Sequence, residues 1–143
     1  MSSALRAAVN AAASALNAER TRIEVAVSNL ANIESTRGPD GQPYRRRDVV
    51  LQSAPVDAFD HVLGRASATG VQVAAIVEDR SAPQMRYEPS HPDADKNGFV
   101  ALPNVDSAEE MVDMVSAARA YQANLTAIGL IRDMVQKALD LGR

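Results

Sequence analysis

Each end of the chain carries an apolar repeat of seven residues, which predicts a long helix at each end. Such a repeat keeps one side of a helix against a partner helix through a left-handed supercoil. The first repeat consists of Val9, Leu16, Ile23 and Leu30. The second consists of Met111, Ala118 and Leu125, with the interleaved Met114, Tyr121, Ile128 and Val135. We expect these residues, the packing seam, to lie at helix–helix contacts within a subunit or between subunits.

Polar residues mark the ends of both helices. We expect the first helix from about Ser3 to about Asn32, because Asn, Ser and Thr side chains that compete for backbone hydrogen bonds accumulate there, and a Gly-Pro-Asp-Gly turn follows at 38–41. We expect the last helix from about Ala108 to Leu141. Ser107 and Glu110 fit a capping box, in which both side chains accept hydrogen bonds from early backbone N–H groups.

The middle of the chain differs in composition, since all seven prolines lie between Pro39 and Pro103. Residues 44–51 form a candidate strand, and the β-branched segment 71–77 is a stronger one. The segment 83–103 reads as a loop, with a further short strand at Phe99 and Val100 left open. The predicted fold is mainly α, with the terminal helices paired as a coiled coil or helical hairpin around a small β-rich or irregular insert. The corresponding division is 1–36, 37–105 and 106–143.

Composition favours a subunit that completes its core with neighbours. The chain has 143 residues, which fits one ordinary domain, but aromatic residues make up only 3% and Trp is absent. Large side chains for a deep core are therefore scarce, while the abundant alanines suit long helices and close helix–helix approach. An elongated helical subunit that packs against copies of itself is at least as well supported as a compact globule.

Charge gives no reason to expect a nucleic-acid partner, because the net charge is −3. The one basic cluster comprises Arg45, Arg46 and Arg47, with Arg37 nearby. Adjacent arginines are more often a solvated face than a dedicated surface for an acidic partner, and the role of this cluster stays open.

The chain contains no cysteine, which excludes disulfides, thiolate metal sites and cysteine nucleophiles. No apolar stretch approaches the ~18 residues of a membrane-spanning helix, so we expect no membrane insertion. The first residues are amphipathic and Ala-rich, and we expect no cleaved secretory signal.

Catalytic and metal-binding motifs are weak. Asp93, Asp95, Asn97 and Gly98 resemble the first half of a calcium loop, but Asn104 stands where a bidentate Glu belongs. A calcium- or metal-dependent binding module centred on 93–98 is the alternative function, and a tight polar turn is the simpler interpretation. No nucleophile elbow, phosphate-binding loop or dinucleotide fingerprint is present, and nothing places His61 or His91 in a triad. We therefore predict no enzyme activity and no cofactor.

Several segments resemble the flagellar rod and hook proteins of bacteria. The Ser-Asn-Leu-Ala-Asn segment at 28–32, followed by Ser35 and Thr36, resembles the signature that closes the first helix of that family. Segments 110–114 and 119–124 match its C-terminal helix, and segments 41–46, 87–98 and 103–105 look like proximal-rod members. The rod-family motif residues are Ser28, Asn29, Leu30, Ala31, Asn32, Arg119, Tyr121 and Asn124. Two small departures are Ser35 for a usual Thr and Gln42 for a usual Gly.

This resemblance implies a non-enzymatic building block of the flagellar basal body that supports motility. It implies a subunit exported through the flagellar type III apparatus, which assembles through its terminal helices into a hollow axial rod crossing the periplasm. The implied partners are copies of the chain, other rod proteins and the ring and export base. On this reading the motif asparagines fix the geometry at the end of the first helix, and Arg45, Glu109, Glu110 and Arg119 are candidates for setting register between subunits.

Overall fold

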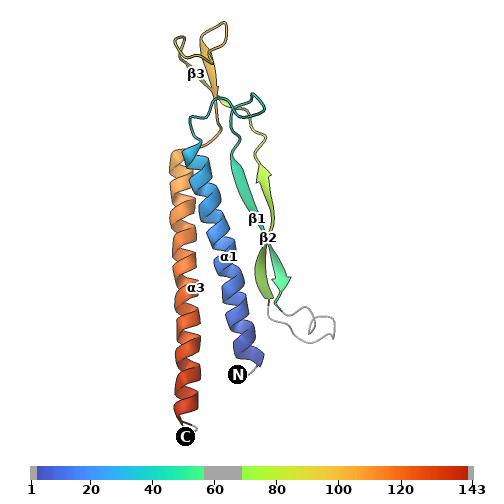
Figure 1. The fold of residues 1–143 in the computed structure, drawn as a ribbon, viewed down its shortest axis with the longest axis vertical. Helices are drawn as coiled ribbons and strands as arrows, with labels where there is room; N and C mark the ends of the chain where they lie inside the picture. Colours follow the sequence, from blue (N-terminus) through green and yellow to red (C-terminus); the bar gives the residue numbers. More distant parts are fainter. Residues whose placement is uncertain (1–2, 57–68, 142–143) are drawn as a thin grey trace.

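The computed structural model describes residues 3–56 and 69–141, which form an elongated molecule (Figure 1). The elements are α1 (Ser3–Ala31), β1 (Arg47–Pro55), β2 (Thr69–Glu78), β3 (Gln84–Tyr87), β4 (Phe99–Leu102) and α3 (Ser107–Leu141). The two helices run side by side in opposite directions, and the β1–β2 ribbon lies along α1 on the side away from α3 (Figure 1). The β3–β4 hairpin projects from the end of the helix pair at which α1 ends and α3 begins.

The fully buried apolar residues of the two helices have small side chains. Ala18 and Ala26 of α1 and Ala117 of α3 are buried, the last with no exposed surface. Because alanine takes little room, it lets neighbouring elements approach the helices closely at these positions. The buried and half-buried positions of α3 include one series with a spacing that averages 3.5 residues. It comprises Glu110, Met114, Ala117, Tyr121, Asn124, Ile128, Ile131 and Val135.

The ribbon is antiparallel, with register from Arg47↔Glu78 to Pro55↔Thr69 and an irregularity between Val50 and Leu51. Its lower end is fixed to α1 by a hydrogen bond from the Val71 amide to Ser14 Oγ (3.1 Å). Gly70 permits this approach, because a Cβ there would stand 2.6 Å from the Ser14 hydroxyl.

The β3–β4 hairpin closes over a small apolar cluster. Val100, Leu102, Pro103 and Val105 are buried, and with the three alanines they make up the buried apolar core of the described residues. On the other side of the hairpin the rings of Tyr87 and Phe99 meet edge to face at 5.3 Å. Gly98 turns the chain into β4 with a φ of 82°, a value that glycine adopts without strain.

The expected mainly α fold class is wrong. Half of the described residues are helical, but 21% lie in two antiparallel sheets, so the chain is a mixed α and β protein and not a coiled coil with a small insert. The sequence missed β3, whose four residues are all exposed and show no alternation of buried and exposed positions. Both terminal helices and the strand at 71–77 were predicted, the candidate strand at 44–51 overlaps β1, and the short strand left open at Phe99 and Val100 is the start of β4. None of the described helices combines the length and apolar character needed to cross a membrane.

Candidate functional site

A buried polar cluster joins the end of α1, the entry to β1 and the start of α3. We call it the hub, and it consists of Asn29, Tyr44, Arg46, Arg47 and Glu110. Asn29 and Glu110 are each 1% exposed, and they are the buried polar residues of the described chain. Buried polar groups cost stability unless they are hydrogen-bonded, so the partners of these two side chains decide what the hub does.

Asn29 uses both ends of its amide. Its Nδ2 donates to the Arg47 carbonyl (2.8 Å) and to Glu110 Oε2 (3.0 Å). Its Oδ1 accepts from the Tyr44 hydroxyl (2.8 Å) and from the Arg47 amide (3.0 Å). One side chain of α1 thus holds the first residue of β1 by both backbone groups and contacts α3 as well.

Glu110 binds Arg46 with its other oxygen, at 2.6 Å from the Arg46 Nε. Asp113 and Asp48 stand further from the same guanidinium, at 3.6 and 3.9 Å. Burial alone would lower the pKa of Arg46, but the hydrogen bond to Glu110 and these three carboxylates together raise the pKa above its ordinary value. Arg46 therefore stays charged at any physiological pH.

The start of α3 frees Glu110 for this role. Asp106 caps the helix, because its Oδ1 accepts from the amides of Ala108 (2.7 Å) and Glu109 (3.2 Å). The predicted capping box of Ser107 and Glu110 is wrong: Ser107 is already the first helical residue, and Glu110 faces the hub.

The remaining residues of the rod-family motif surround the hub or lie further along α3. Asn32 makes only local bonds, donating to the Ser28 carbonyl (2.8 Å) and accepting from the Ser35 hydroxyl (3.0 Å). Ser28 Oγ also lies 3.4 Å from the Tyr44 hydroxyl. In this motif Leu30 is half-buried and Ala31 exposed, and on α3 Arg119 is exposed while Tyr121 and Asn124 are half-buried.

The structure divides the predicted packing seam. Val9, Leu16, Ile23, Leu30, Met114, Tyr121 and Ile128 are half-buried, whereas Met111, Ala118 and Leu125 are exposed. The two sets on α3 occupy neighbouring stripes of the helix, and only one stripe faces α1. Sequence reasoning missed the buried alanines, because it counted large apolar residues. It also missed Glu110, although Glu110 lies four residues before Met114 and so continues the buried series of α3. That spacing was the signal in the sequence that could have identified it.

The loop proposed to bind calcium uses its carboxylates internally. Asp93 accepts from the Thr36 hydroxyl (2.8 Å) and pairs with Arg37 (2.6 Å), which holds the segment after α1. Asp95 Oδ1 accepts from the amides of Asn97 (2.7 Å) and Phe99 (2.9 Å). Within residues 3–56 and 69–141 no three metal-ligating side chains of the His, Cys, Asp and Glu type converge. His61 lies outside the described residues.

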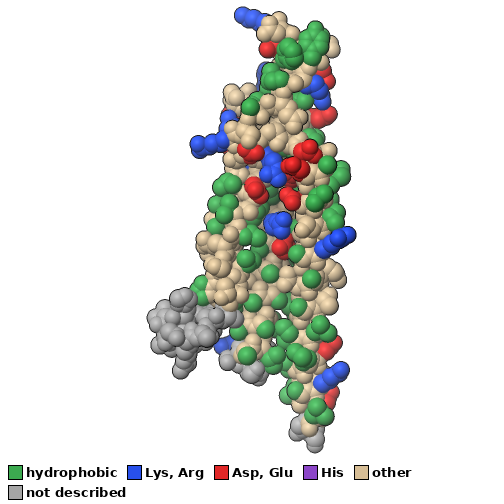
Figure 2. All heavy atoms as spheres, turned by 180° about the vertical axis from the view of Figure 1, so that it is seen from behind, with side chains coloured by type: hydrophobic (Ala, Val, Ile, Leu, Met, Phe, Trp, Pro, Cys, Tyr) green, Lys and Arg blue, Asp and Glu red, His purple; other side chains and the backbone are tan. Residues whose placement is uncertain are grey.

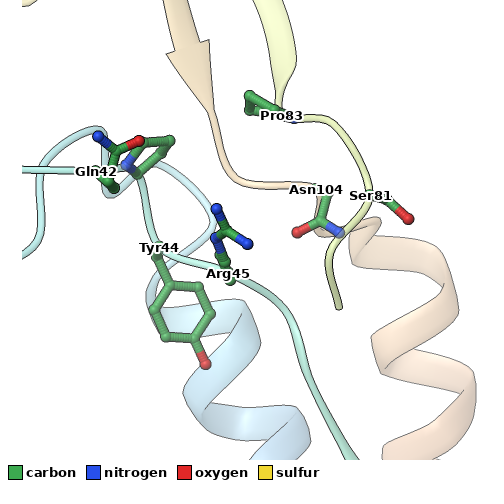
Figure 3. Close-up of a pocket in the computed structure, with 7 residues that line it drawn as sticks. Gln42, Tyr44, Arg45, Ser81, Pro83 and Asn104 are labelled. Carbon is green, nitrogen blue, oxygen red and sulfur yellow. The ribbon is translucent and has the colours of Figure 1, made fainter. Parts of the chain in front are cut away.

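The three adjacent arginines do different work. Arg46 faces the hub, and the Arg47 guanidinium lies 5.6 Å from the centre of the Tyr44 ring. Arg45 is exposed and lines a small pocket with Gln42, Tyr44, Ser81, Pro83 and Asn104 (Figure 3). Asn104 Oδ1 accepts from the Arg46 amide (3.1 Å), and its buried Nδ2 has no hydrogen-bond partner among the described residues.

Comparison with known proteins assigns the family. Residues 3–39 match the family described as flagella basal body rod protein, and residues 96–141 match the C-terminal family of the flagellar basal body rod FlgEFG proteins. The flagellar basal-body rod protein FlgC of Salmonella typhimurium is 48% identical, over 92% of this chain and 93% of its own length. The FlgC proteins of Bacillus subtilis (44%, over 94% and 96%) and Borreliella burgdorferi (42%, over 94% and 95%) are similar throughout. The resemblance found in the sequence is confirmed: the chain belongs to the FlgC family of flagellar basal-body rod proteins, which are structural subunits of the rod and not enzymes.

Proposed function

We propose that this chain is a subunit of the proximal rod, which assembles with copies of itself and with other rod proteins through α1 and α3 into a hollow axial shaft. Family membership supports assembly into the rod. The observation that carries the role of the helices is the set of large apolar side chains that α3 exposes along its length.

Large apolar side chains are exposed along much of this helix. Their exposed fractions run from 43% for Leu125 to 89% for Leu141, and the set comprises Met111, Val112, Val115, Leu125, Leu130, Met134, Leu139 and Leu141. Figure 2 shows hydrophobic side chains continuing toward the free end of α3. Exposed apolar area of this extent marks an interaction surface, and a long helix gains most of its stability from packing. A neighbouring subunit would supply that packing.

The finer details of the proposal follow from the family. We propose export through the flagellar type III apparatus, a rod position that crosses the periplasm, and contact with the ring and export base. We propose that the chain divides into an N-terminal rod helix (1–36), a central insert (37–105) and a C-terminal rod helix (106–143), and that the two helices mediate assembly. On this proposal the exposed part of the packing seam, which consists of Met111, Ala118 and Leu125, contacts a neighbouring subunit.

Replacing Leu125 by Asp tests the proposal. Because the side chain is 43% exposed in the subunit, the substitution should change the free energy of unfolding of the purified chain, measured in urea, by less than about 1 kcal/mol. In a motile bacterium that lacks its own copy of the gene, the variant should be exported, but it should not enter basal bodies or restore swimming, since an intersubunit contact would bury an unpaired charge. His91→Gln, in the 88–95 turns, is the control and should swim normally. Normal assembly of Leu125→Asp together with loss of swimming for His91→Gln would refute the role given to α3.

A further inference from the structure

The molecule has two flanks, because α1 lies between α3 and the ribbon (Figure 1). The view from behind agrees, with the ribbon on one side and α3 on the other (Figure 2). The upper end of the ribbon and the start of α3 both adjoin the hub, through Arg47 and Glu110. Two different surfaces therefore lie at the same level on opposite sides of one subunit.

The ribbon flank carries a hollow lined by Arg45, Val77, Glu78 and Arg80, which we call the basic hollow. Val77 is 44% exposed, and the neighbouring Ile76 is 50% exposed. Glu78 already has a cation, Arg47, at 4.0 Å. Arg45 and Arg80 are exposed, and neither forms an ion pair within the described chain.

Asp79 offsets part of the positive charge beside the basic hollow, but it forms no ion pair with Arg45 or Arg80 in the described chain. Its carboxylate accepts hydrogen bonds from the Ser81 hydroxyl (2.7 Å) and amide (2.8 Å), and these bonds lower its pKa. The ionised Asp79 is thereby held by the turn after β2. Arg45, Arg47 and Arg80 outnumber Glu78 and Asp79 here, so the surface beside exposed Val77 is apolar in one part and cationic in another.

The α3 flank has the opposite character. It carries four acidic residues, of which Glu110 and Asp113 pair with Arg46; the four are Asp106, Glu109, Glu110 and Asp113. Glu109 is exposed and forms no ion pair in the described residues. Directly below it a second hollow is lined by Met111, Val112, Val115, Ser116 and Arg119. We call Glu109 with Met111, Val112 and Val115 the acidic shoulder.

We propose that the basic hollow of one copy docks on the acidic shoulder of a second copy. Arg45 and Arg80 would meet Glu109, and Val77 would cover Met111 and Val112. This inference rests on the proposed assembly role and adds which flank meets which. Charge complementarity at the rim selects the partner and its register, while the apolar side chains supply the buried area. Because the contact joins two different surfaces, its repetition with copies in the same orientation produces a ring or a helical array.

Thiol crosslinking tests the pairing, since the chain has no cysteine of its own. A chain with both Val77→Cys and Val112→Cys, incorporated into basal bodies and treated with a short bismaleimide, should give a ladder of self-crosslinked multimers. The single variants should give none, because neither flank is expected to meet its own kind. A double variant that is present in basal bodies but gives no ladder would overturn the inference, as would dimers from Val77→Cys alone.

Charge reversal provides the second test. Arg45→Glu with Arg80→Glu should abolish swimming, and adding Glu109→Arg to the same chain should restore it. Lys96→Glu, an exposed charge on the distant hairpin, is the matched control and should swim normally. Failure of Glu109→Arg to restore swimming, when both variants keep the circular dichroism spectrum of the parent, would count against the pairing. The proposed function would survive that result, because it is tested separately by Leu125→Asp.

Discussion

Replacing Asn29 by Ala removes the side chain on which the hub depends. The four hydrogen bonds of Asn29 reach the Arg47 carbonyl and amide, the Tyr44 hydroxyl and the Glu110 carboxylate, at 2.8 to 3.0 Å. With the residue 1% exposed, water has little access to replace it. We therefore expect a large loss of stability from a substitution at the end of a helix, where most substitutions are mild.

The size of the loss follows from the bonds. Each of the three neutral bonds contributes about 1 kcal/mol, and the bond to the Glu110 carboxylate about 2 kcal/mol, which gives about 5 kcal/mol. A domain of ordinary stability has about 5–15 kcal/mol in total. Asn29→Ala should therefore unfold the subunit at far lower urea concentrations, or prevent stable folding altogether.

Urea unfolding followed by circular dichroism measures this effect, and Asn32→Ala is the matched control. Asn32 belongs to the same motif and the same helix end, but its two bonds are local and reach only Ser28 and Ser35. Its removal should cost about 1 kcal/mol. If Asn29→Ala lost no more stability than Asn32→Ala, the hub would not be the structural centre that its geometry indicates.

Three glycines allow further predictions by the same measurement. Gly98→Ala should lose about 1–2 kcal/mol, because φ is 82° and the added Cβ would stand 2.9 Å from the Tyr87 ring. Gly70→Ala should lose about 1–3 kcal/mol by overpacking against Ser14, and exchange of the neighbouring amide hydrogens in β2 should accelerate. Gly129→Ala should instead gain about 0.5–1 kcal/mol, because nothing lies within 4 Å of the new Cβ on α3. A loss of stability would contradict the open space around this position.

The elements themselves were largely predictable, and the exception has a physical reason. The periodicity of apolar residues located α1 and α3, the β-branched segment 71–77 located β2, and weaker apolar signals indicated β1 and left β4 open. β3 pairs with β4 through its backbone, and its four side chains remain exposed. A strand that buries nothing leaves no pattern in the sequence, so its extent and the mixed fold class could not be found there.

The hub was much harder to predict. Asn29 and Glu110 are separated by 81 positions, and no local rule brings them together. The acidic start of α3 invites the interpretation that Glu110 serves the helix end, yet Asp106 fills that role and leaves Glu110 to pair with Arg46. Similarly, three adjacent arginines read as one charged surface. The backbone instead directs Arg46 inward and leaves Arg45 exposed. Because the three residues are identical, their residue types give no basis for predicting which one is buried.

A polar hub suits a subunit whose helices carry an apolar repeat of seven residues. Apolar attraction is not directional, and Met114, Tyr121 and Ile128 recur every seventh residue, so a shift of one heptad would bring similar side chains together again. A shift of one heptad, about 10 Å, would separate Asn29 from Glu110 and leave a buried amide and a buried carboxylate unpaired. The same side chains hold Arg46 and Arg47, so the ribbon is fixed to the point that fixes the helices. The hub therefore sets the level at which the α3 flank and the ribbon flank stand opposite each other, and docking of one flank on the other requires that level to be the same in every copy.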